Sequence, residues 1–84
     1  MSAIRVTLRC FSHVRQRLNA ASLELTLPAG STTADLEAHV RQLLGPSDIK
    51  MVFRIAVNQQ FVAGVQALRD GDEVALLPPM QGGA

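Results

Sequence analysis

Hydrophobic and polar residues alternate with a period of two in three stretches of the chain, residues 4–10, 23–27 and 53–57. This spacing is typical of β-strands that bury one face, so each stretch is predicted to be a strand. Pro28 and Gly30 end the second strand. The first two strands are close in sequence and are expected to pair antiparallel. A shorter apolar run at residues 74–77 predicts a last strand.

A period near 3.6 residues predicts the main helix. Thr32 can cap its first turn, with Asp35 three residues later as the carboxylate of a capping box. Gly45 and Pro46 are the expected stop. The apolar stripe of this helix consists of Leu36, Val40, Leu43 and Leu44. A second, short helix or helical turn is predicted within residues 12–19.

Turn residues complete the order of elements. Asn58-Gln59-Gln60 ends the third strand, residues 61–63 form a short strand or bridge, and Asp70-Gly71-Asp72 precedes the last strand. A helix crossing one face of a small mixed sheet, with the last strand beside the first, fits this order. We therefore predict an α+β chain with a β-grasp, ubiquitin-like domain over residues 1–79 and a flexible tail at residues 80–84.

Composition excludes several classes of protein. The 84 residues suffice for one modest core, and at 48% hydrophobic residues the chain is not disordered by composition. Cys10 is the only cysteine, which excludes an internal disulfide framework and any four-thiolate metal site. The net charge is +1 and the arginines are scattered, so nucleic-acid binding is not expected. No run is long enough to span a membrane and no signal segment is evident, so a cytoplasmic protein is expected.

The C-terminal tail is the most unusual part of the chain. Pro78 and Pro79 follow the last strand, and because proline fixes φ and lacks an N–H they should end the sheet and direct the chain outward. Gly82 and Gly83 have no Cβ, so their backbone can enter a narrow channel. This pattern favours a tail presented to the active site of another protein. The alternative is a frayed terminus without a role.

The stretch from Asp70 to Gly83 has the sequence Asp-Gly-Asp-Glu-Val-Ala-Leu-Leu-Pro-Pro-Met-Gln-Gly-Gly. It resembles the C-terminal signature of the small subunit of molybdopterin synthase, a family of ubiquitin-like sulfur carriers. The segments 11–17 and 56–59 and the single central helix are also similar to that family, so the resemblance covers essentially the whole chain. The sulfur carrier of the thiamine pathway shares the fold and the Gly-Gly end, but it usually lacks the Pro-Pro.

The resemblance implies a chemistry for the tail. An adenylyltransferase of the ubiquitin-activating type would use ATP to join AMP to the Gly83 carboxylate, and a sulfur donor protein would then convert this end to a thiocarboxylate. The tail would deliver sulfur to a pterin precursor in the large subunit of molybdopterin synthase, within a heterotetramer. Members of the family end at the second glycine, whereas Ala84 follows Gly83 here. Either a peptidase removes Ala84, or the free end is at Ala84 and the chemistry is blocked or altered. No bound cofactor or metal is implied.

The resemblance also implies a docking surface on the sheet. Strand parity places Phe11 opposite the first strand's apolar residues and Leu77 opposite Val74 and Leu76, while Phe61 follows a polar turn. The family's matching positions are apolar residues that partners cover. The predicted partner-binding residues are Phe11, Phe61, Leu77, Pro78, Pro79, Met80 and Gln81. The alternative is that the three large apolar residues belong to the core.

No motif indicates an active site of the chain's own, so its C-terminus is predicted to be the reagent. His13 and His39 have no second ligand at metal spacing, and Cys10 shares the parity of core residues. The acidic residues of segment 70–73 are interpreted as turn formers. Two other functions stay open, a ubiquitin-like modifier joined to lysines through Gly83 and a passive interaction module.

Overall fold

The computed structural model describes residues 2–45 and 53–77 of the chain. Its elements in chain order are β1 (Ala3–Cys10), α1 (Ser12–Leu18), β2 (Ser22–Pro28), α2 (Thr33–Leu44), β3 (Arg54–Val57), β4 (Gln60–Phe61) and β5 (Glu73–Leu77). These elements confirm the predicted order. Two boundaries differ, since β3 begins one residue later than the alternation indicated and β4 is only two residues long.

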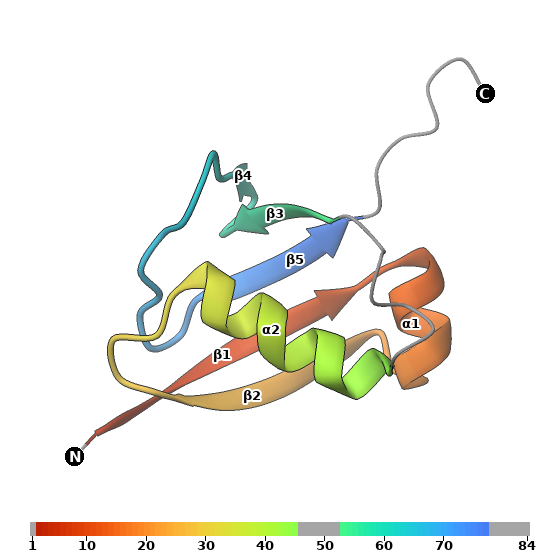
Figure 1. The fold of residues 1–84 in the computed structure, drawn as a ribbon, viewed down its shortest axis with the longest axis horizontal. Helices are drawn as coiled ribbons and strands as arrows, with labels where there is room; N and C mark the ends of the chain where they lie inside the picture. The colour runs from red at the N-terminus through yellow and green to blue at the C-terminus, as the bar shows by residue number, and fades with distance from the viewer. Residues whose placement is uncertain (1, 46–52, 78–84) are drawn as a thin grey trace.

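The strands form one mixed sheet in the order β2-β1-β5-β3-β4. As predicted, β1 pairs antiparallel with β2, and β5 lies parallel beside β1 in the middle of the sheet. Helix α2 crosses one face of the sheet, and α1 lies near the end of β1 (Figure 1). This arrangement confirms the expected β-grasp fold. Within the described residues, no helix is long and apolar enough to cross a membrane.

The core lies between α2 and the covered face of the sheet. Alternate residues of β1, beginning with Ile4, are buried, and the residues between them are exposed or half-buried. The core cluster consists of Ile4, Val6, Leu8, Cys10, Val14, Leu25, Leu27, Leu36, Val40, Leu44, Val57, Leu68, Val74 and Leu76. The buried face of the strands therefore packs against the buried stripe of α2, as the sequence predicted.

Leu43 corrects the predicted helix stripe, because its side chain is 47% exposed. The buried residues of α2 are instead Thr33, Leu36, Val40 and Leu44. At about 100° per residue these four span an arc of about 80°, and Leu43 falls about 20° outside it. The helix therefore presents Leu43 to solvent at the edge of the stripe.

Both ends of α2 are capped. The Asp35 N–H donates to the Thr32 hydroxyl at 3.3 Å and the Thr32 N–H donates to the Asp35 carboxylate at 2.8 Å, which confirms the capping box. At the other end Gly45 is the C-cap with φ 94°, a backbone angle that favours glycine. The Arg17 guanidinium donates to the Leu44 carbonyl at 2.9 Å and so ties α1 to the end of α2. Pro46, the other predicted stop residue, lies outside the described residues.

Candidate functional site

The sheet face opposite α2, called here the open face, carries two of the predicted docking residues, Phe61 and Leu77. Strand register places on it residues that are neighbours across the five strands. They are Arg5, Thr7, Arg9, Ser22, Glu24, Thr26, Arg54, Ala56, Phe61, Glu73, Ala75 and Leu77. Most of these side chains are exposed, since the described helices pack elsewhere.

One row of the open face is apolar over three strands. Ala75 of β5 pairs with Ala56 of β3, which in turn pairs with Phe61 of β4. The β3–β4 connection is a two-residue turn in which Asn58 and Gln59 have φ of 51° and 71°. A turn with positive φ at both central residues has a twist that matches the twist of the two strands it connects. This turn therefore lets β4 pair with β3 so that Phe61 lies opposite Ala56.

Phe61 is the most exposed aromatic residue among those described. Its side chain is 58% exposed at the edge strand β4. The Arg54 guanidinium lies over its ring, 4.1 Å from the centroid. The structure therefore places Phe61 on the surface and not in the core, in agreement with a docking residue.

Phe11 lies just beyond the end of β1, as the extended N-cap residue of α1. It is 37% exposed. The Arg9 guanidinium lies 5.8 Å from its ring centroid and also pairs with the Glu73 carboxylate at 3.2 Å. Phe11 is therefore a partly exposed aromatic residue beside Arg9 of the open face.

Leu77 joins the open face to the tail. Burial alternates along β5, with Val74 and Leu76 buried in the core and Leu77 half-buried on the other side. Its neighbour across the sheet is Arg54 of β3. The other predicted tail residues, Pro78, Pro79, Met80, Gln81, Gly82, Gly83 and Ala84, lie outside the described residues.

The acidic residues before β5 have structural partners. The Asp70 carboxylate accepts from the Arg5 N–H at 2.7 Å. The Asp72 carboxylate accepts from the Arg69 N–H at 2.8 Å and from the Asn58 amide at 3.0 Å. These bonds join the turn to β1 and to the β3–β4 turn, and so confirm that Asp70 and Asp72 serve turn geometry. Glu73 differs from the prediction, because it is the first residue of β5 and pairs with Arg9.

Cys10 and His39 lie where the sequence predicted, Cys10 in the core and His39 on the exposed side of α2. Burial raises the pKa of the Cys10 thiol, whose Sγ lies 4.0 Å from the Leu8 carbonyl. His39 is exposed on α2, and the described residues hold no cluster of three or more groups that could bind a metal. The side chain of His13 lies outside the described part of the structure.

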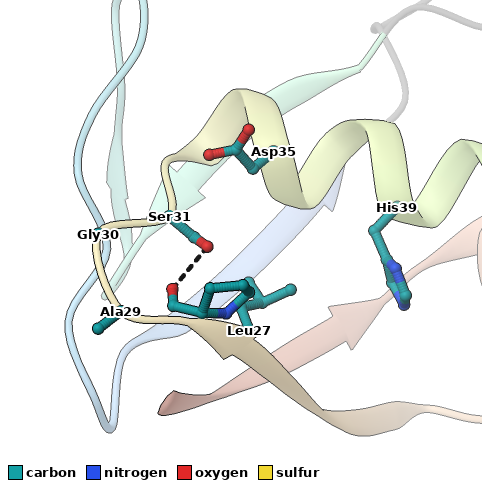
Figure 2. Close-up of a pocket in the computed structure, with 7 residues that line it drawn as sticks. Leu27, Ala29, Gly30, Ser31, Asp35 and His39 are labelled. Carbon is teal, nitrogen blue, oxygen red and sulfur yellow. Dashed lines mark hydrogen bonds between the residues drawn. The ribbon is translucent and has the colours of Figure 1, made fainter. Parts of the chain in front are cut away.

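A surface pocket of about 430 Å³ lies between the β2–α2 turn and α2 (Figure 2). Its volume is within the range of small-molecule sites. Two of its polar side chains already have structural partners, however, because the Ser31 hydroxyl donates to the Pro28 carbonyl at 2.7 Å and the Asp35 carboxylate caps the helix, which leaves His39 as its other polar side chain. We therefore place the candidate site on the open face and not in this pocket.

Sequence reasoning missed Arg54. Arg54 points to the side of β3 opposite Ile55 and Val57, which pack in or against the core, so its position in the strand indicates the open face. Its contact with Phe61, however, depends on the two-residue turn at Asn58-Gln59. Asparagine tolerates positive φ, and this turn signal between two strands could have predicted the pairing.

Comparisons with known proteins identify relatives of the whole chain. The model of the ThiS family matches residues 8–83. The molybdopterin synthase sulfur carrier subunit of Arabidopsis thaliana is 25% identical over 83 residues, covering 98% of this chain and 86% of the relative. A solved structure from Pyrococcus furiosus, assigned as molybdopterin converting factor subunit 1, has a TM-score of 0.81 and 26% identity over 92% of this chain and 99% of that one. The Helicobacter pylori complex of subunits 1 and 2 of molybdopterin-converting factor matches in fold, with a TM-score of 0.64 and 24% identity over 95% of this chain and 100% of that one.

Proposed function

The chain belongs to the ThiS family, and from this premise we propose that it is a sulfur carrier, the small subunit of a molybdopterin synthase. The observation that carries the proposal is the ending Pro-Pro-Met-Gln-Gly-Gly, which follows β5 directly. The relatives named for molybdopterin synthesis support the choice of pathway. We further propose that the protein works in the cytoplasm.

The proposed reaction explains why the C-terminus is the reagent. A carboxylate is a poor electrophile, because its negative charge repels nucleophiles. ATP would therefore be used by an adenylyltransferase to convert the Gly83 carboxylate to an acyl adenylate, with release of pyrophosphate. Sulfide (HS⁻) supplied by a donor protein would then attack the acyl carbon, so that a C–S bond forms as the C–O bond to AMP breaks. Loss of the S–H proton to water leaves the thiocarboxylate. An ionised sulfur of this kind is a good nucleophile at neutral pH.

Ala84 must be removed for this chemistry to occur at Gly83. In the full sequence the Gly83 carbonyl belongs to a peptide bond, so it offers no free carboxylate for adenylation. We propose that a peptidase hydrolyses this bond and releases alanine. A chain that ends at Gly83 and the full chain form a matched pair for testing this step.

We propose two docking partners for the open face, the adenylyltransferase and the large subunit of molybdopterin synthase. The Helicobacter pylori complex supports the second, since a chain of the same fold is there bound to subunit 2. Each partner would cover Phe11, Phe61 and Leu77 and receive the tail. An arrangement with one small subunit at each end of a large-subunit dimer would make a heterotetramer.

The test is the intact mass of the protein purified from its own cells, with fragmentation of the C-terminal peptide. We expect a chain that ends at Gly83, part of it carrying sulfur in place of one carboxylate oxygen. A chain that wholly keeps Ala84 while the cofactor is being made would refute the proposal. High-mass conjugates to lysines of other proteins would instead favour a modifier.

Gly82→Ala provides a second test of the tail. A methyl group at this position would prevent close approach in a narrow channel, and misplacing the reacting end can cost up to roughly 100-fold in rate. The measurement is adenylation and sulfur loading of a chain ending at Gly83. Leu43→Ala is the control, because Leu43 is exposed on α2 and lies outside the tail and the predicted docking residues. Normal loading of Gly82→Ala would refute the channel argument.

A further inference from the structure

The Arg54–Phe61 pair combines an exposed apolar ring with a charge at one edge of the open face. From its geometry and charge we propose that Arg54 is a specificity-determining residue, which selects partners whose matching surface is an apolar pocket edged by carboxylates. This proposal rests on the proposed function, because it assigns the chemistry of the partner surface that receives the tail.

The first step of the argument is the position of the ring. The Arg54 guanidinium lies 4.1 Å from the Phe61 centroid, well inside the distance of about 6 Å at which such contacts are attractive. The contact covers part of the ring and holds its orientation, yet the residue stays 58% exposed. A side chain that is already ordered loses less freedom on binding, so Phe61 is preorganised as an anchor.

The second step is the charge. Within residues 2–45 and 53–77, no carboxylate forms an ion pair with Arg54. Arg9 next to Phe11 differs, because the Glu73 carboxylate pairs with it at 3.2 Å. A partner that covers Phe61 would also remove water from Arg54. Burying an unpaired charge is costly, whereas a carboxylate on the partner would compensate it, so an acidic pocket edge is favoured over a neutral or basic one.

The third step is the location. Arg54 pairs with Leu77 across the sheet, and Leu77 is the residue that precedes the Pro-Pro of the tail. An ion pair at Arg54 would thus form at the base of the tail. Discrimination between partners would therefore occur next to the segment that enters the active site.

The experiment measures the Kd of the chain ending at Gly83 for the purified large subunit and for the adenylyltransferase. Measurements at about 0.1 M and about 1 M salt change the Debye length from about 10 Å to about 3 Å. The variants are Arg54→Gln, which removes the charge, and Arg54→Glu, which reverses it. Arg69→Gln is the matched control, because Arg69 is an exposed arginine in the segment before β5 and is not part of the open face.

We expect Arg54→Gln to weaken binding roughly 10-fold at the lower salt concentration, as for loss of a hydrogen bond to a charged group. Arg54→Glu should weaken it further, and both differences should shrink at the higher salt concentration. Arg69→Gln should stay within about twofold of the wild type, since single surface charges contribute little. Circular dichroism should show all three variants folded, because both arginines are exposed.

Two results would overturn the proposed role of Arg54 and leave the proposed function intact. One is equal binding of Arg54→Gln and the wild type at the lower salt concentration. The other is a loss of the same size at both salt concentrations, which would indicate that Arg54 only supports the ring. Failure of the proposed function is distinguishable from both, because the wild type would then bind neither protein, and that outcome overturns both proposals.

Discussion

Truncation of Phe61 is the sharpest test of the open face. A phenylalanine presents about 150–250 Å² of surface, and Phe61 is 58% exposed in the free chain. If a partner covers that exposed part completely, about 25 cal/mol per Å² gives about 2–3.5 kcal/mol of binding energy. Phe61→Ala should therefore weaken binding to the large subunit by roughly 30- to 300-fold.

The same substitution should leave the fold intact. Phe61 lies on the edge strand β4, and its main described contact is the Arg54 guanidinium. Loss of that contact should lower the free energy of unfolding by about 0.5–1 kcal/mol. Calorimetric titration against the large subunit measures the Kd, and urea unfolding measures the stability of the same samples.

Leu43→Ala is the matched control, because Leu43 is 47% exposed but projects from α2, which covers the other face of the sheet. It should bind as the wild type does. The reasoning is refuted if folded Phe61→Ala binds within about threefold of the wild type. An equal loss in Leu43→Ala would show that exposed apolar area, and not the open face, accounts for binding.

Three further predictions concern the domain itself. Leu36 is fully buried, so Leu36→Ala should lower the free energy of unfolding by about 2–5 kcal/mol in urea titrations, and a loss no larger than that of Leu43→Ala would contradict the core assignment. Thr32→Ala removes the helix cap and should lower the free energy of unfolding by about 1 kcal/mol, whereas Thr32→Ser keeps the hydroxyl and should retain most of that stability. Equal losses in the two variants would argue against the role of the hydroxyl. Burial raises the pKa of the Cys10 thiol, so alkylation should be much slower in the native chain than in urea, and equal rates would contradict its burial. Because the pKa of the Cys10 thiol is raised in the folded chain, the free energy of unfolding should not change with the state of this thiol below its ordinary pKa. Above that pKa the free energy of unfolding should fall, because the thiol loses its proton first in the unfolded chain.

Periodicity in the sequence determined the fold. Alternation in β1 and β2 and the stripe of α2 state which side chains are buried, and packing of those buried sides against one another leaves few arrangements for a chain of this length. In β3 the last two residues, Ala56 and Val57, are both buried, so burial there does not follow the alternation. The capping box of α2 was equally predictable, because its two partners are three residues apart. The segment Pro-Pro-Met-Gln-Gly-Gly could likewise be recognised from the sequence, because the resemblance behind the proposed tail chemistry depends on residue types and not on neighbours in space.

Tertiary structure alone decided which polar and exposed residues meet. Arg54 lies on Phe61 because a two-residue turn sets the register of β3 and β4, and beside Leu77 because β3 also pairs with β5. Leu43 is exposed because the arc of α2 that contacts the sheet ends just before it. A periodic pattern specifies the face on which a side chain lies. Its partners on that face depend on strand register and helix rotation, which are set by contacts between residues far apart in the chain.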